Sequence, residues 1–179
     1  RRRGRCRWRE IPILNRRRFT KLADMSVEPI PEGHTSLTPF LCIDGASAAI
    51  DFYVSVFGAE LVDRMDGPNG TVAHAELDFG DGRLQRSDPN EAYHLAAPDA
   101  GPSVTHSVAL YCEDTDAVVA RAEKAGATIR EPAQTFVTSD RFASILDPFG
   151  QRWTVMTRVE DVSPEERDRR MAEWADENV

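Results

Sequence analysis

Cysteine and long apolar runs are scarce in this sequence of 179 residues. The cysteines number three, Cys6, Cys42 and Cys112, and an odd, widely spaced set favours a reducing compartment over a disulfide framework. No apolar run approaches the roughly 18 residues of a membrane helix. The N-terminus also lacks the apolar core of about 7–15 residues that secretory signals carry. These absences predict a cytoplasmic protein without a membrane partner.

Positive charge is also scarce outside the N-terminus. Residues 1–24 hold nine arginines and one lysine against Glu10 and Asp24, which gives this segment a charge of +8. Since the whole chain has a formal net charge of −8, the remainder from Met25 onward carries −16. An acidic body argues against nucleic acid as the main partner.

Residues 1–34 are expected to form a basic extension rather than part of a folded domain. One interpretation is an arm that contacts phosphate groups. The other is a disordered extension, with Met25 as the true first residue. Pro29, Pro31 and Gly33 then predict an extended lead-in to the first strand.

The most informative stretch runs from Ser144 to Val155. It reads as a strand, a tight turn at Asp147–Gly150 and a second strand, because Pro148 presets its own φ and Gly150 can adopt a positive φ. Trp153 and Val155 alternate with polar residues, which is the period of a half-buried strand. A hairpin alone is marginally stable in water, so it must belong to a larger sheet.

The chain before this hairpin predicts one strand, one helix and three strands, in that order. Asp44 is expected to cap the helix, whose apolar residues recur at the helical period, and Gly58 to end it. The apolar set is Ile50, Tyr53, Val54 and Phe57. The expected strands span residues 37–43, 60–65, 71–79 and 83–87, and a polar linker follows at 88–102.

The same order then repeats. A strand at 104–112, a helix capped by Asp114, a strand at 127–132 and the hairpin follow one another. Gly58-Ala59 and Gly126-Ala127 are 68 residues apart, as are Gly82 and Gly150. We interpret this as two copies of a βαβββ unit, residues 35–88 and 103–158, within one domain at 35–160. Ser163-Pro164-Glu165-Glu166 then predicts the start of a C-terminal helix within 161–179.

These motifs resemble the vicinal oxygen chelate superfamily, which includes glyoxalase I, extradiol dioxygenases and bleomycin-binding proteins. The resemblance rests on the paired units, on Ala49-Ile50-Asp51-Phe52-Tyr53 with Phe57-Gly58-Ala59, and on Asp147-Pro148-Phe149-Gly150. Thr38-Pro39-Phe40, His74-Ala75-Glu76-Leu77 and Gly150-Gln151-Arg152-Trp153 are similar to its PhnB-like branch. The resemblance implies an α+β fold in which two curved mixed sheets form a half-barrel around a ligand cavity. It also implies a homodimer.

In metal-dependent members, four ligands point into that cavity. The corresponding positions here are Thr38, Gln85, Ser107 and Thr154. A divalent transition metal needs imidazole or carboxylate ligands, and three hydroxyls with one amide are poor substitutes. We therefore expect no metal and no other cofactor.

Strand alternation sorts the remaining residues between the helix side and the cavity side. Leu37, Leu41 and Ile43, with Ala73, Ala75, Leu77 and Phe79, are expected under the helices. The expected ligand-binding residues are Thr38, Phe40, Cys42, Arg83, Gln85, Ser107, Tyr111, Phe142, Ser144, Thr154 and Met156. Cys42 could act as a nucleophile, or it could be an inert buried thiol.

His74 and Glu76 share the cavity face of one strand within about 7 Å. Such a pair could perform acid–base chemistry, with Glu76 as the base. Alternatively, Glu76 and Arg83 form a cross-strand ion pair and His74 lies at a wet rim. His34 and His94 lie in loops and suggest no role.

The leading functional hypothesis is a metal-free protein that binds an aromatic or drug-like metabolite in the cavity. The alternatives are an isomerase or lyase that uses Glu76 with His74, and a metal-dependent enzyme similar to glyoxalases or dioxygenases. Nucleic-acid binding through the arginine-rich extension is a further, separate possibility.

Overall fold

The computed structural model describes residues 27–99, 101 and 103–178. The chain divides into one unit at 1–31 and a compact unit at 32–179, which contains the helices and strands described here. The expectation for residues 1–26, a disordered or phosphate-contacting arm, lies outside the described residues. Over the described part of the chain, no helix combines the length and apolarity needed to cross a bilayer.

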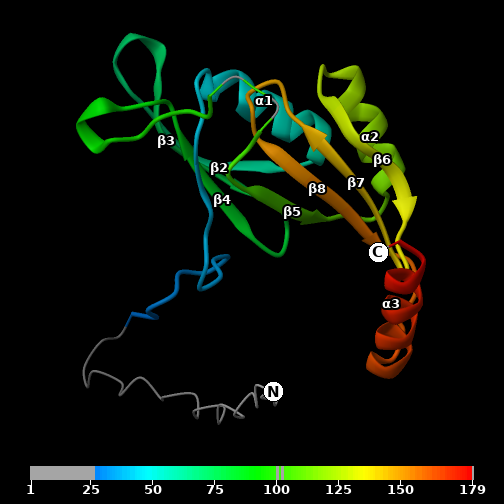
Figure 1. Ribbon diagram of the computed structural model, residues 1–179. Coiled ribbons are helices and arrows are strands. Elements are labelled where there is room, and N and C mark those ends of the chain that lie inside the picture. Colours follow the sequence, from blue (N-terminus) through cyan, green and yellow to red (C-terminus); the bar gives the residue numbers. More distant parts are fainter. Residues whose placement is uncertain (1–26, 100, 102, 179) are drawn as a thin grey trace, which may run out of the picture. The chain divides into compact units, whose positions relative to one another are not determined.

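Two βαβββ halves follow one another, as the repeat predicted (Figure 1). The first half contains β1 (Phe40–Cys42), α1 (Ala46–Phe57), β2 (Glu60–Asp66), β3 (Val72–Asp78) and β4 (Arg83–Ser87). The second contains β5 (Ser107–Tyr111), α2 (Thr115–Lys124), β6 (Thr128–Thr135), β7 (Asp140–Leu146) and β8 (Arg152–Arg158). Helix α3 (Pro164–Asn178) ends the chain, and short 3₁₀ turns lie at Pro68–Gly70 and Glu91–Tyr93.

Each half forms one open mixed sheet of four strands. The strand orders are β1-β4-β3-β2 and β5-β8-β7-β6, with the first pair parallel and the other pairs antiparallel in both sheets. The expected fold class, α+β with two βαβββ units and a C-terminal helix, is therefore confirmed.

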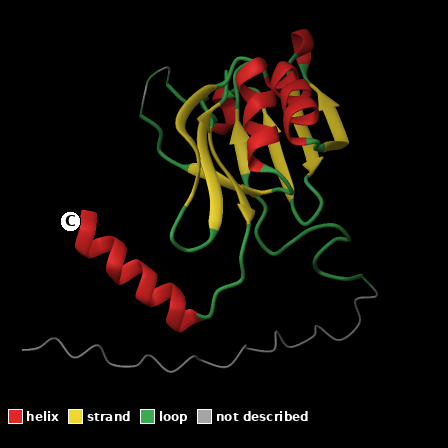
Figure 2. Cartoon of the chain, turned by 90° about the vertical axis from the view of Figure 1, so that its right-hand side faces the viewer, coloured by secondary structure: helices red, strands yellow, loops and turns green. Residues whose placement is uncertain are grey.

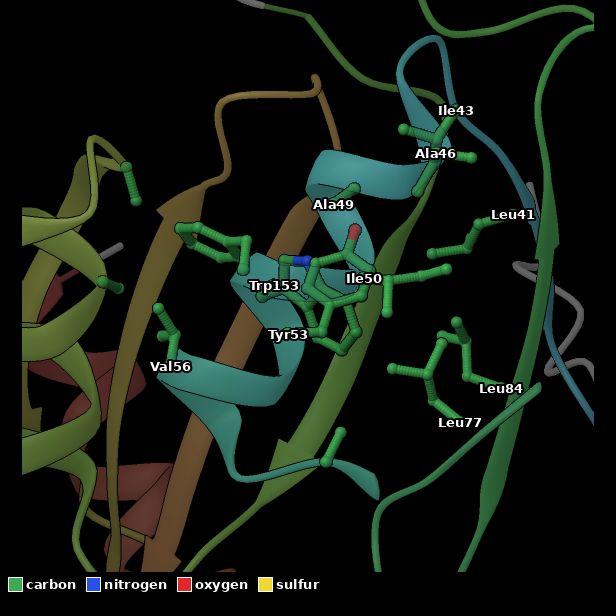
Figure 3. Packing of buried hydrophobic residues seen from close by; sticks show 14 of the residues in the cluster. Leu41, Ile43, Ala46, Ala49, Ile50, Tyr53, Val56, Leu77, Leu84 and Trp153 are labelled. Atoms are coloured by element: carbon green, nitrogen blue, oxygen red, sulfur yellow. The ribbon is translucent and has the colours of Figure 1, made fainter. Parts of the chain in front are cut away.

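Helix α1 lies between the two halves and buries more than one face. Ile50 points toward Leu77 and Leu84 of its own sheet, while Tyr53 lies against Trp153 of β8 (Figure 3). The helix also contacts α2. The buried residues are Ala46, Ala49, Ile50, Phe52, Tyr53 and Val56. Of the apolar residues that recur at the helical period, Ile50 and Tyr53 are buried, whereas Val54 is 42% exposed.

The end of α1 and the hairpin turn follow the expected geometry. Gly58 is left-handed at φ 75°, and its N–H bonds to the carbonyls of Tyr53 and Val54. At the β7–β8 turn, Asp147 Oδ1 accepts the backbone N–H groups of Phe149 (2.9 Å) and Gln151 (2.8 Å). Gly150 has φ 84° in this turn, a backbone conformation that would be strained for a residue with a side chain.

The start of α1 differs from expectation. Gly45 occupies the N-cap position, and no side chain at that position caps the helix. Asp88, the residue after β4, accepts the N–H groups of Gly45 and Ala46 through Oδ1, each at 3.0 Å. Its Oδ2 accepts the N–H of Val72 at 2.6 Å. Asp88 thus performs the capping role that we assigned to Asp44.

Two strand assignments also change at their ends. The strand expected at 37–43 is β1 at Phe40–Cys42, and Leu37 is 81% exposed rather than packed under the helix. In β3, Val72 is buried and Ala73 exposed, the reverse of expectation. The cause is an irregular pairing, because Met65 faces His74 whereas the next residue, Asp66, faces Val72.

Helix α3 lies apart from α1 and α2 (Figure 2). The Ser163 hydroxyl accepts the Glu166 N–H at 3.2 Å, as the capping sequence predicted. The helix contacts the segment between β6 and β7, where Trp174 meets Phe136 edge to face with ring centroids 5.5 Å apart. Arg170 also donates to the Ser139 hydroxyl at 2.8 Å and pairs with Glu160 at 2.9 Å.

Candidate functional site

A cluster of polar side chains occupies the face of the first sheet that points away from α1. Strand pairing sets Gln85 opposite Glu76 and Arg83 opposite Asp78. Since residues two apart on a strand share a face, Glu76, Arg83 and Gln85 come together there. Phe40 of β1 lies on the same face, opposite Gln85 in the parallel pairing.

The Glu76 carboxylate is the centre of this cluster. Arg83 Nη1 donates to Glu76 Oε1, and Gln85 Nε2 donates to Glu76 Oε2 at 3.2 Å. The imidazole Nε2 of His34 lies 3.1 Å from the same Oε2. Only 10% of the Glu76 side chain is exposed. Burial by itself would raise the pKa of Glu76, but the hydrogen bonds from Gln85, Arg83 and His34 together lower it.

This arrangement favours the structural ion pair over the poised base. A lowered pKa makes the Glu76 carboxylate a weaker proton acceptor, and its hydrogen bonds would have to break during catalysis. His74 shares the face of β3, but it lies against the Phe40 ring with centroids 6.1 Å apart. The imidazole that contacts Glu76 belongs instead to His34, and the role of His74 and Glu76 in catalysis stays a prediction.

His34 comes from the lead-in segment, to which the sequence suggested no role. The adjoining Gly33 has φ 77°, and a Cβ atom at that position would collide with the Arg83 guanidinium. Glycine here therefore lets the backbone lie directly on Arg83. The available signal was a glycine and a histidine just before the first strand, a pattern too common to indicate this contact.

The second sheet carries a different group of polar contacts. Ser107 and Thr154 hydroxyls lie 3.1 Å apart, and Arg152 Nε donates to the Ser144 hydroxyl at 2.8 Å. Arg152 also pairs with Glu131 at 2.7 Å. Phe142 meets Phe136 edge to face. Tyr111, Thr154 and Met156 belong to the same sheet, where Tyr111 and Phe142 both face Met156 in the strand pairing.

The predicted ligand-binding residues thus divide between two sheets. Thr38, Phe40, Cys42, Arg83 and Gln85 belong to the first half, and the remaining six belong to the second. Phe40 and Tyr111 are exposed, Ser144 is buried, and Thr38, Cys42, Gln85, Phe142, Thr154 and Met156 are half-buried. Burial, followed by the charges of Asp88 and Asp44, raises the pKa of Cys42, which favours the inert thiol.

The four positions that correspond to metal ligands do not suit a metal. The amide nitrogen of Gln85 is directed to Glu76, and Ser107 and Thr154 contact one another. All four groups are hydroxyls or an amide, whereas transition metals in proteins are bound by imidazole, thiolate or carboxylate. Across the described residues, no group of three or more His, Cys, Asp or Glu side chains is placed to hold a metal ion.

A cavity of about 300 Å³ lies where the first sheet meets β5. Arg83 and Tyr111 are the predicted site residues that line it. Most other lining side chains are apolar, and they come from the lead-in, the β3–β4 turn, β4, β5 and β8. The apolar lining residues are Leu37, Pro39, Phe79, Leu84, Val108, Ala109, Leu110 and Trp153. The polar residues Thr35 and Asp81 also line the cavity.

Paired βαβββ units with an open sheet in each half define a recognisable class of protein. The model of the Glyoxalase/Bleomycin resistance protein/Dioxygenase superfamily matches residues 33–155. The chain belongs to this superfamily, as the resemblance in its motifs indicated.

Similar proteins are found in several bacteria. The uncharacterized protein Mb0911c of Mycobacterium bovis is 30% identical over 155 residues, which cover 85% of this chain and 98% of that protein. The crystal structure of TioX from Micromonospora sp. ML1 is 28% identical, with a TM-score of 0.56, over 70% of this chain and 99% of that one. The PhnB protein from Bacillus cereus is 21% identical with a TM-score of 0.54, covering 69% and 99% of the two chains, and shows likeness of fold alone.

Proposed function

We propose that this protein binds a small aromatic or drug-like metabolite, without a metal, in the cavity between its halves. The observation that supports the proposal is the composition of this cavity, which has apolar and aromatic walls and a few polar groups at one side. Cavities of roughly 300–1,000 Å³ with this composition are typical of small-molecule sites. Arg83 is one of the polar groups, and its orientation is set by Glu76 and Asp78.

The tight bonding of Glu76 favours binding over catalysis. A carboxylate held by Arg83, Gln85 and His34 orients the guanidinium at the cavity edge without being available as a base. The cluster would then serve to keep Arg83 fixed, so that little conformational entropy is lost when a ligand arrives.

Calorimetry against a panel of aromatic natural products tests the proposal. Ala109 is exposed and lines the cavity, so Ala109→Trp should fill the cavity and abolish binding while the protein stays folded. Ala120→Trp, at an exposed position on α2, is the matched control and should bind normally. Binding should also persist in the presence of a chelator. Unchanged affinity in Ala109→Trp, or no binding by any compound, would contradict the proposal.

The homodimer implied by the family also stays a proposal. Strand β2 is fully exposed and carries the apolar side chains Leu61, Val62 and Met65 at the edge of the first sheet. Unpaired sheet edges of this kind are available for contact with another chain.

A further inference from the structure

The cavity between the halves continues into a second one. The second cavity, of about 640 Å³, lies between the β3–β4 turn, the end of β5 and the start of α2. Both cavities are lined by Phe79, Asp81, Leu110 and Tyr111, so they adjoin along these residues. We call the two together the junction groove.

Carboxylates outnumber guanidinium groups around the junction groove. Asp81, Glu113 and Asp114 line it directly. Arg83 also lines it, but this guanidinium is already paired with Glu76 and with Asp78. Arg121, the other lining cation, donates its Nε to the Val56 carbonyl at 2.9 Å. The charged groups that line the groove sum to −1, and together with Glu76 and Asp78, which pair with Arg83 but line neither cavity, they sum to −3 with histidine taken as neutral.

Further cations near the groove do not offset this negative charge. Arg158 pairs with Asp140 at 3.4 Å and with Asp161 at 3.6 Å, and Arg141, whose charge interacts with Asp114, pairs with Asp116. The chain beyond its first 24 residues is itself strongly acidic, at −16. An anionic ligand would therefore enter a groove whose field opposes it, whereas a cationic ligand would be attracted.

Aromatic side chains complete the recognition of such a cation. Tyr111 is shared by the two cavities and is 56% exposed, so its ring is open to a ligand. Phe57 and Phe79 line the second cavity as well. Cations bind favourably over the faces of aromatic rings, and the apolar walls suit the uncharged part of the same molecule.

We propose that the ligand of the junction groove is a positively charged amphiphilic aromatic molecule, and that the groove discriminates against anions. This inference rests on the proposed function and adds the charge of the ligand to it. The chemistry that would satisfy the groove is a flat apolar ring system bearing an ammonium or amidinium group.

Three probes with one ring system isolate the contribution of charge. Isothermal titration calorimetry at low salt compares 2-naphthylmethylammonium, 2-naphthamide and 2-naphthoate. We expect the ammonium compound to bind at least about tenfold more tightly than the carboxylate, since the net negative charge of the groove attracts the one and repels the other. The preference should shrink at about 0.5 M salt, where screening shortens the range of the field.

Substitutions at the groove then locate the effect. Asp81→Asn should reduce the preference for the ammonium probe about two- to threefold. Asp176→Asn, on the exposed surface of α3, removes the same charge elsewhere and should leave the preference unchanged. An equal effect of the two variants would assign the preference to overall charge and overturn the inference. Equal or tighter binding of the carboxylate would overturn it too, yet leave the proposed function standing. Binding of none of the three probes would count against the proposed function itself.

Discussion

Both oxygens of the Glu76 carboxylate accept hydrogen bonds from basic or amide side chains in a mostly buried place. Hydrogen bonds to a charged group contribute about 1.5–3 kcal/mol, and removal of one partner leaves the other side chains with unmet donors. Glu76→Gln should therefore lower the free energy of unfolding at pH 7 by about 1.5–3 kcal/mol. Chemical denaturation of the variant and the wild type measures this difference.

The same difference should depend on pH. The folded protein lowers the pKa of Glu76 from its ordinary value of 4.5, so the folded state binds this proton more weakly than the unfolded state. The carboxylate thus contributes its full stabilisation above the unfolded value and loses it as the pH falls through the lower folded value. We expect the gap between Glu76→Gln and the wild type to narrow below about pH 4. A gap that stays constant down to about pH 3 would show that the charge is not responsible.

The sequence predicted the direction of individual side chains where they follow the regular alternation of a strand. Alternation brought Glu76, Arg83 and Gln85 to one face, and their hydrogen bonds show that they meet there. Their role in ligand binding stays a prediction. The contact of His34 could not be predicted, because the lead-in has no period that fixes the direction of its side chains.

Among the secondary-structure elements, α1 depends on a residue far from it in the sequence. Asp88 accepts three backbone N–H groups, those of Gly45, Ala46 and Val72, and so joins the start of α1 to β3. Loss of a cap costs about 0.5–2 kcal/mol, and the orphaned N–H of Val72 adds to that. Asp88→Ala should lower the free energy of unfolding by about 2–3 kcal/mol.

Asp44→Ala is the matched control for this prediction. Asp44 is exposed, and it is the residue that local sequence rules select as the cap. Its substitution should change stability by less than about 0.5 kcal/mol. If Asp44→Ala cost as much as Asp88→Ala, the observed capping arrangement would be contradicted. Denaturation curves of both variants, with helix content followed by circular dichroism, supply the measurement.

The element-level errors have a common physical origin. Local rules placed the strands and helices of the described residues near their observed positions, because these depend on hydrophobic periodicity and on glycine and turn residues. They assigned the cap of α1 to Asp44, but the distant residue Asp88 caps it. They also placed Leu37 and Ala73 under the helices, but β1 begins only at Phe40 and the pairing of β3 with β2 is irregular. Local rules also grouped Val54 with the apolar residues of α1, yet it is 42% exposed. Which side of α1 is buried depends in part on the second half, where Trp153 packs on Tyr53.

At the scale of the whole molecule, the repeat of 68 residues predicted the duplication but not how the halves are joined. Trp153 of the second half lies 5.0 Å from Tyr53 and 4.6 Å from Phe57 of the first, centroid to centroid. Tyr53 donates its hydroxyl to Asp147 at 2.7 Å, and Trp153 Nε1 donates to the same oxygen at 3.1 Å. The Arg86 guanidinium lies over the Tyr53 ring at 5.0 Å. These contacts make one core from two sheets.

A shared core predicts that the two halves unfold together. The calorimetric enthalpy of unfolding should equal the van't Hoff enthalpy, as expected for a single cooperative transition. Trp153→Ala should lower the free energy of unfolding by about 3–5 kcal/mol, because it removes a buried ring that touches both halves.

Trp174→Ala is the control for Trp153→Ala, because it removes a tryptophan that does not connect the two halves. Trp174 is 36% exposed and its ring meets Phe136, outside the core that joins the halves. Its substitution should cost less than Trp153→Ala does, since more of the Trp174 side chain is in contact with water and less apolar area is lost. Two resolved transitions in the wild type, or equal costs for Trp153→Ala and Trp174→Ala, would mean that the halves are stable separately. In that case the cavity between them would lose the rigid walls that the proposed ligand binding requires.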